Sequence, residues 1–439
     1  MDCKHFAKRR TELMQLMGDG IAIVPTAPQL IRNRDVHFPF RADSDFLYLT
    51  GFAEPEALAV LVPGRVGGEF LMFCRPRDPE RETWDGRRAG PEGVISAYGA
   101  DQAFPISELD SRLPALLENQ RRVFYSMGRH ADLDQRILGW LNEVRGKARS
   151  GVAAPAEFLD LDQPLHELRL IKHAEEIRVM RRAARISAEG HRRAMRAARP
   201  GGHEYELEAE LLYAFRHEGS QYPAYPAIVG GGANGCILHY VENNAPLRDG
   251  DLVLIDAAAE LDGYASDITR TFPVNGHFTG PQRAAYEVVL AAQEAAIAQV
   301  VPGKHWNDPH DTAVRVLTAG LVDLGLLTGS VDGLLEQGSY RAFYMHRTGH
   351  WLGLDVHDVG DYKVDGAWRE LEPGMVLTVE PGLYITPAPG VDERFWNIGI
   401  RIEDDVLVTH EGPDVLSSDA PKTVADIETL MARPRARSR

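Results

Sequence analysis

The stretch LVLIDAAAELDGYASDITRTF (residues 252–272) places two carboxylates in an apolar, β-rich region. One β-run reaches Asp256, turn residues follow at Asp262-Gly263, and a second β-run carries Asp267, which together predict a hairpin. A two-residue turn there pairs Asp256 with Thr269 and leaves Asp267 two positions along on the same face, whereas a turn one residue earlier sets the two acids opposite each other. A three-residue turn would separate them, and two unrelated polar residues at a sheet edge would give the same pattern. Two carboxylates on one buried face repel each other, and a bound cation relieves that repulsion.

A similar pattern occurs twice in the second part of the chain. A helical run that ends in RPGG (199–202) precedes GDLVLID (250–256), and another that ends in VPGK (301–304) precedes GMVLTVE (374–380). In each case a glycine begins a β-run whose acid falls six residues later. The self-similarity predicts two related α+β halves that face each other, with a site shared between them.

Two further acids end apolar β-runs. Glu380 closes MVLTVE and Glu403 closes NIGIRIE, positions where a carboxylate adds nothing to packing. Together with Asp256 and Asp267 they make four strand-borne acids, and this number favours a common function over chance.

The segment HRTGHWLGLDVHD (346–358) holds three histidines and no cysteine. It does not match the helical zinc motif H-E-x-x-H, because Arg347 follows His346 and Gly349 interrupts the segment. An isolated histidine is more often structural than a ligand, but the four acids favour a ligand role for at least one of the three. Four carboxylates offset two divalent cations, and mainly oxygen ligands suit Mn²⁺, although Co²⁺ or Zn²⁺ would fit. Two such ions activate a water and polarise a carbonyl, so metal-assisted hydrolysis is predicted.

Composition limits the other functions. The chain has 439 residues and a formal net charge of −16, which argues against nucleic-acid or anionic-membrane partners. The three cysteines are widely spaced and predict neither disulfides nor a thiolate metal site, so a cytoplasmic protein is expected. We also expect no secretion signal and no membrane-spanning segment.

The organisation along the chain predicts two domains. Short β-runs alternate with amphipathic stretches over residues 1–160, typical of an α/β domain, and a segment rich in Gly, Pro and small residues follows. The second domain is expected over residues 165–425. The basic tail at 426–439 is expected to be disordered.

Three motifs resemble one known family. The segments DSDFLYLTGFAEPEA (43–57) and ETWDGRRAGPEG (82–93) are similar to aminopeptidase P, and HRTGHWLGLDVHD is similar to the signature that prolidase and aminopeptidase P share. The resemblance covers nearly the whole chain except the basic tail. It implies an α/β N-terminal domain, active in oligomerisation and at the substrate entrance, and an α+β C-terminal pita-bread domain with an internal pseudo-twofold repeat.

The resemblance also implies roles for individual residues. The five ligands of a dinuclear, typically manganese, site would be Asp256, Asp267, His350, Glu380 and Glu403, with Glu380 also accepting the proton of the attacking water. The scissile carbonyl would be bound by His239 and His357. The pocket for proline would be lined by His346, Tyr384 and Arg401, and the substrate entrance by Arg149 and by Trp84, the latter from a neighbouring subunit. For Tyr384, Arg401 and Trp84, ordinary sheet or surface positions remain the alternative.

The implied activity is hydrolysis of the bond between an N-terminal residue and a penultimate proline, by an enzyme that forms a dimer or tetramer. Prolidase, which acts on Xaa-Pro dipeptides, is the alternative within the same class. A metal-free binding module of the same fold is the alternative from another class, and the intact set of ligand residues argues against it.

Overall fold

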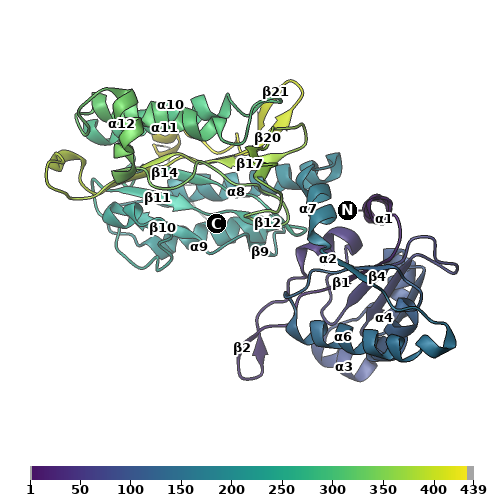
Figure 1. The fold of residues 1–439 in the computed structure, drawn as a ribbon. Helices are drawn as coiled ribbons and strands as arrows, with labels where there is room; N and C mark the ends of the chain where they lie inside the picture. Colours follow the sequence, from purple (N-terminus) through teal and green to yellow (C-terminus); the bar gives the residue numbers. More distant parts are fainter. Residues whose placement is uncertain (1, 433–439) are drawn as a thin grey trace. The chain divides into compact units, whose positions relative to one another are not determined.

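The computed structural model describes residues 2–432 and divides into two compact units, Met1–Arg169 and Leu170–Arg439 (Figure 1). The division lies a few residues beyond the boundary expected near residue 160. Residues 157–159 form a strand of the first unit, so the expected linker segment is partly built into that unit. The second half of the expected tail, residues 433–439, lies outside the described residues.

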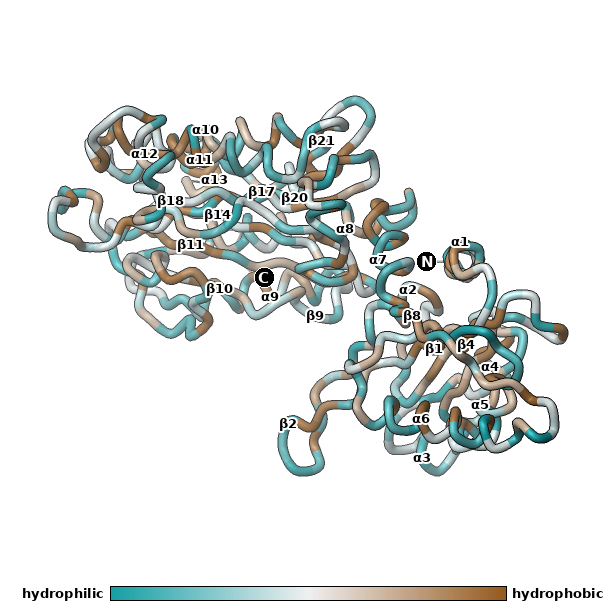
Figure 2. The backbone as a smooth tube through the Cα atoms, in the orientation of Figure 1, coloured by the Kyte–Doolittle hydropathy of each residue, from teal (hydrophilic) through white to brown (hydrophobic). Residues whose placement is uncertain are grey.

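The first unit is an α/β domain built on one mixed sheet. The strand order is β6-β5-β4-β1-β7-β8, in which β1, β4 and β5 are antiparallel neighbours and the outer pairs are parallel. Apolar residues of the strands pack against α5 and α6 in one core, and the apolar character of β1 and β4 is visible in Figure 2. The helices and strands of this unit are α1 (Cys3–Met17), β1 (Ile21–Pro25), β2 (Ile31–Asn33), β3 (Val36–His37), α2 (Ser44–Thr50), β4 (Leu58–Leu61), β5 (Phe70–Cys74), α3 (Pro79–Asp85), α4 (Gly90–Tyr98), β6 (Gln102–Pro105), α5 (Leu109–Leu117), β7 (Arg122–Phe124), α6 (Ala131–Gly146), β8 (Glu157–Leu159) and α7 (Asp162–Leu170).

The second unit contains the predicted internal repeat. Each half consists of a helix pair followed by a three-stranded antiparallel sheet, first α8 and α9 with β10-β11-β14, then α10 and α11 with β17-β20-β21. Its elements are α8 (Ala174–Ala197), α9 (Glu204–His217), β9 (Tyr222–Pro223), β10 (Ile228–Gly231), β11 (Leu252–Asp256), β12 (Ala259–Leu261), β13 (Tyr264–Ala265), β14 (Thr269–Pro273), α10 (Gly280–Ile297), α11 (Asp308–Asp323), α12 (Val331–Gln337), β15 (Lys363–Val364), β16 (Ala367–Trp368), β17 (Val376–Val379), β18 (Gly382–Ile385), β19 (Ile398–Arg401), β20 (Asp404–Thr409), β21 (Gly412–Val415) and α13 (Val424–Met431).

The predicted turn at Asp262-Gly263 is present. Both residues have positive φ, and Leu261 pairs with Tyr264 across it, while Asp256 pairs with Thr269 as one of the two expected registers required. The prediction that Asp267 lies within a strand was wrong. Residues 266–268 lie between β13 and β14, and the Asp267 N–H donates to the Asp405 side chain instead of to a neighbouring strand.

The expectation that the tail is disordered from residue 426 was wrong for its first residues. Residues 424–431 form α13, which begins at a Thr423 cap and buries Ile427 and Leu430 in the core of the second unit. Burial of the apolar face of this helix stabilises it, although the sequence that follows is basic. Among residues 2–432, none of the helices combines the length and hydrophobicity needed to span a membrane.

Candidate metal centre

A cavity of about 620 Å³ opens in the second unit, at the ends of the strands of both halves. Nine of the twelve predicted site residues line it: Asp256, Asp267, His350, Glu380, Glu403, His239, His346, His357 and Arg401. The five expected ligands therefore converge on one space, although they are spread over nearly 150 residues of sequence.

The pseudo-repeat explains why four acids meet there. In the first half Asp256 is the last residue of β11, and Asp267 lies just before β14, the partner of β11. In the second half Glu380 directly follows β17, and Glu403 directly precedes β20, the partner of β17. Each half thus presents one acid where the chain leaves a strand and one where it returns.

His350 is oriented by its backbone surroundings. Its Nδ1 donates to the Trp351 carbonyl at 2.9 Å, and its Nε2 faces the Asp267 carboxylate at 3.3 Å and Glu380 at 3.8 Å. A Cβ on the preceding residue, Gly349, would overlap the Thr378 carbonyl oxygen, so only glycine allows this close approach of the loop to β17. Ligand atoms of Asp267, His350 and Glu403 all lie within 4.8 Å of one another, close enough to share an ion.

Three carboxylates of this cluster, Asp267, Glu380 and Glu403, have raised pKa values. Burial and the nearby Asp267 and Asp256 raise the pKa of Glu380 to about 7, although His350 and Arg401 act in the opposite direction. Burial and the neighbouring acids also raise the pKa of Asp267 and, more strongly, of Glu403. Burial alone would lower the pKa of His350, but Asp267 and Glu380 raise it to about 9. The cluster therefore has an excess of negative charge that a cation would relieve.

Tyr225 is a residue of the site that the sequence did not reveal. Its hydroxyl oxygen lies 2.6 Å from an Asp256 carboxylate oxygen and 2.5 Å from an Asp267 carboxylate oxygen, so its one proton is shared between two of the expected ligands. Burial and these two acids raise the pKa of Tyr225 well above its ordinary value, which keeps the phenol a donor. Tyr225 lies just before β10, the strand that pairs with β11. Its partners are 31 and 42 residues away, so no local pattern could identify it.

His346, Tyr384 and Arg401 form one hydrogen-bonded group beside the acids. The Tyr384 hydroxyl lies 2.8 Å from His346 Nε2 and 2.9 Å from Arg401 Nη1, and Arg401 Nη2 donates to Asp256 at 2.6 Å. Burial and the charge of Arg401 lower the pKa of His346 to about 3, so this imidazole is neutral. The expected pocket residues are therefore adjacent to the expected ligands.

The remaining predicted residues are spread over both units. His239 and His357 have exposed side chains on the cavity wall, and the His357 ring centroid lies 4.3 Å from that of His350. Arg149 and Trp84 belong to the first unit, where Trp84 is 86% exposed on α3.

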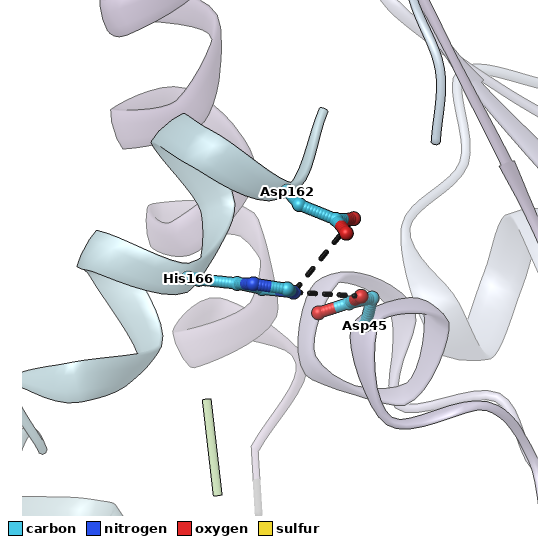
Figure 3. Close-up of side chains that lie close together, drawn as sticks. All are labelled: Asp45, Asp162 and His166. Carbon is cyan, nitrogen blue, oxygen red and sulfur yellow. Dashed lines mark hydrogen bonds and ion pairs between the residues drawn. The ribbon is translucent and has the colours of Figure 1, made fainter. Parts of the chain in front are cut away.

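A second group of acids and an imidazole lies in the first unit. Asp45, Asp162 and His166 also have ligand atoms within 4.8 Å of one another, and His166 Nε2 lies between the two carboxylates (Figure 3). Arg169 contacts Asp45 at 2.7 Å, and Arg129 bonds to both acids. Two guanidinium groups thus balance two carboxylates, and the group is an ion-pair network between α2 and α7 rather than an unsatisfied cation site.

Comparison with known proteins identifies the family. The model of metallopeptidase family M24 matches residues 178–410, and the model of the aminopeptidase P N-terminal domain matches residues 6–125. The chain is 46% identical to the Xaa-Pro aminopeptidase of Escherichia coli over 434 residues, which cover 98% of both chains. The protein belongs to metallopeptidase family M24. Human Xaa-Pro aminopeptidase 3 is a further relative, 36% identical over 98% of this chain and 86% of its own length.

Solved structures of this M24 family show the same fold along the whole chain. Aminopeptidase PepP of Pseudomonas aeruginosa superposes with a TM-score of 0.97 at 57% identity and covers 98% of each chain. The zinc-substituted aminopeptidase P of E. coli, solved with product, superposes with a TM-score of 0.96 at 46% identity, covering 99% of this chain and all of the other. The expected architecture, an α/β N-terminal domain with an α+β pita-bread domain, is thereby confirmed.

Proposed function

We propose that the protein is a metal-dependent Xaa-Pro aminopeptidase that removes an N-terminal residue from peptides with proline in second position. One observation carries the proposal. Four carboxylates and an imidazole converge on one cavity in a member of the M24 family, and within residues 2–432 only Asp256 of the four has an arginine or lysine ion pair.

The residues of the cavity fit divalent metal ions. The donor set is four carboxylates and one Nε2 that faces them, and burial together with mutual repulsion raises the pKa of Glu380 and Glu403. We assign Asp256, Asp267, His350, Glu380 and Glu403 as ligands of two ions, with Mn²⁺ as the expected metal. Such ions, when bound, lower the pKa of a water and polarise the scissile carbonyl.

The side chains around these ligands would perform the remaining tasks. Glu380 is placed to accept a proton from the attacking water, because its carboxylate lines the cavity beside the other expected ligands. His239 and His357, on the cavity wall, would donate hydrogen bonds to the carbonyl oxygen as negative charge develops there.

Proline explains the need for a dedicated enzyme. The bond before proline has no N–H that a protease could bind, and the ring restricts the preceding residue. The hydrogen-bonded group of His346, Tyr384 and Arg401 would form the wall against which the ring and the following residue pack.

We also propose that residues 165–425 form the catalytic domain and that the N-terminal domain, residues 1–160, assembles a dimer or tetramer. In the N-terminal domain, Arg149 and Trp84 would act at the substrate entrance. Exposed apolar side chains in the first unit support assembly, since Ile31 on β2 is 62% exposed and Trp84 is 86% exposed. A cytoplasmic location is supported by three free cysteine thiols, Cys3, Cys74 and Cys236.

Hydrolysis of an Xaa-Pro-Yaa tripeptide by chelator-treated protein, before and after addition of Mn²⁺, tests the proposal. We expect activity only after the metal is added, and two bound metal ions per chain by elemental analysis. Turnover of Xaa-Pro dipeptides but not of the tripeptide would identify a prolidase instead. Purified protein that binds no metal would contradict both and favour the binding module.

A further inference from the structure

Arg270, on β14, lies at the junction of the two halves and is fully buried, with 0% of its side chain exposed. An arginine has five N–H donors, and each one of Arg270 has an acceptor here. Nε donates to the Pro421 carbonyl at 3.1 Å, Nη1 to two carbonyls, and Nη2 to the Asp404 carboxylate at 2.7 Å and the Ala420 carbonyl at 2.9 Å. A guanidinium so completely bonded cannot move without breaking several hydrogen bonds.

One of the two carbonyls bound by Nη1 belongs to a proposed metal ligand. The two carbonyls are those of Thr269, at 2.9 Å, and of Glu403, at 2.6 Å. The same two residues are joined directly, because the Glu403 N–H donates to the Thr269 carbonyl at 3.1 Å and the Thr269 hydroxyl donates to the Glu403 carboxylate at 2.6 Å. Arg270 therefore links the backbone that follows Asp267 to the backbone that carries Glu403.

Asp404 completes this arrangement from the other half. Its second oxygen accepts hydrogen bonds from Gln293 and Lys422, both at 2.7 Å, and the first also accepts one from Ser417. The charges of Arg270 and Lys422 hold the pKa of this buried carboxyl well below its ordinary value despite burial. On β20, Asp404 pairs with Val379, the residue before Glu380.

One buried ion pair thus touches the segments that present Asp267, Glu403 and Glu380, while its own atoms bond none of their carboxylates. Lysine could not replace Arg270, because its three donors radiate from one point and cannot reach four carbonyls and a carboxylate together. Groups that orient metal ligands in this way set the affinity for the metal.

We infer that Arg270, with Asp404, is the positioning unit that fixes the separation of Glu403 from Asp267 and so sets the affinity of the centre for divalent metal. The inference rests on the proposed function, since it presupposes that these acids bind metal. It concerns residues that lie outside the ligand set and outside the substrate cavity.

The test compares Arg270→Lys and Asp404→Asn with the wild-type full chain after removal of metal. Mn²⁺ affinity is measured by isothermal titration calorimetry, and the stability of the metal-free protein by thermal unfolding. We expect each variant to fold and its Kd for Mn²⁺ to rise by about 10–100-fold. Arg181→Lys is the matched control, because Arg181 forms an ion pair with Asp414 in the same unit but at the surface, and its Kd should stay unchanged.

A purely structural role predicts a different result. The metal-free variants would then unfold at lower temperature while the folded protein bound Mn²⁺ within about twofold of wild type, and that outcome would overturn the inference. If Arg270→Lys does not fold, the isosteric Asp404→Asn decides by the same criterion. A wild-type protein that binds no Mn²⁺ would overturn the proposed function and the inference with it, whereas unchanged affinity in the variants overturns only the inference.

Discussion

The two groups of acids and an imidazole in this chain look alike in composition but differ in charge balance. In the first unit, Asp45 and Asp162 face two arginines, and hydrogen bonding to His166 and the charge of Arg169 hold the pKa of Asp45 well below its ordinary value despite burial. In the second unit, burial and mutual repulsion raise the pKa of the corresponding carboxyls.

This difference in charge balance shows that proximity of ligand-type atoms does not by itself indicate a metal site. Both groups bring three ligand atoms within 4.8 Å. What separates them is whether the protein supplies its own cations, because a buried carboxylate that already has a guanidinium partner gains little from an ion and would have to give that partner up. The unbalanced group lines the cavity of about 620 Å³ in the second unit.

The largest effect is expected from removing a carboxylate of the group in the second unit. Asp267→Ala, or Glu403→Ala, should abolish tripeptide hydrolysis and reduce the number of metal ions bound, because each removes a ligand shared by the cluster. Asp162→Ala in the first unit is the matched control and should leave metal content and kcat unchanged. Substantial residual turnover in Asp267→Ala, measured alongside its metal content, would contradict its assignment as a ligand.

A smaller effect is expected from breaking the balanced group. Asp45→Asn removes the carboxylate that the buried Arg169 guanidinium contacts at 2.7 Å, and this loss of a buried ion pair should lower the free energy of unfolding of the first unit by about 3–5 kcal/mol. Urea denaturation measures the loss. Since no metal is involved, the loss should be the same with and without Mn²⁺, and a loss that Mn²⁺ reversed would show that the first group also binds metal.

The smallest effect, and the sharpest contrast, is in the dependence of stability on pH. The pKa of Glu380 is raised from 4.5 to about 7 in the metal-free fold, so between these values the folded state binds more protons, and stability falls as pH rises. The pKa of Asp45 is lowered, so its contribution is present above pH 3.8 and is lost as pH falls below it.

Thermal unfolding of the metal-free protein from pH 3 to pH 8 checks both signs. Glu380→Gln should remove part of the decline between pH 4.5 and pH 7, and Mn²⁺ should offset it, because the metal needs the deprotonated carboxylate. A metal-free protein whose stability rose steadily to pH 8 would contradict the charge imbalance proposed for the second group.

The sequence predicted the part of the site that strand periodicity controls. Asp256, Glu380 and Glu403 stand at the ends of apolar runs, and the register of Asp256 also follows from the positive φ turn at Asp262-Gly263. Asp267 lines the cavity, although its backbone lies outside the strand that alternation predicted.

The remainder depends on contacts that sequence spacing does not encode. Tyr225 and Arg270 have hydrogen-bond partners many residues away in the sequence. The Arg270 side chain donates mainly to backbone carbonyls, and because every residue has one, no sequence pattern marks these partners. The ion-pair network of Asp45 and Arg169 joins residues 124 positions apart. The helix at 424–431 was missed because the basic composition beyond it obscured a short apolar face.

The segment from Ser417 to α13 has a consequence for synthesis of the chain. Ala420, Pro421 and Lys422 supply partners of the Arg270 and Asp404 pair, and α13 fills part of the core, yet all of them leave the ribosome after every proposed metal ligand. A nascent chain therefore carries the whole set of ligands before it can hold them in place. The full set of hydrogen bonds around Arg270 and Asp404 can form only after residue 422 has been synthesised.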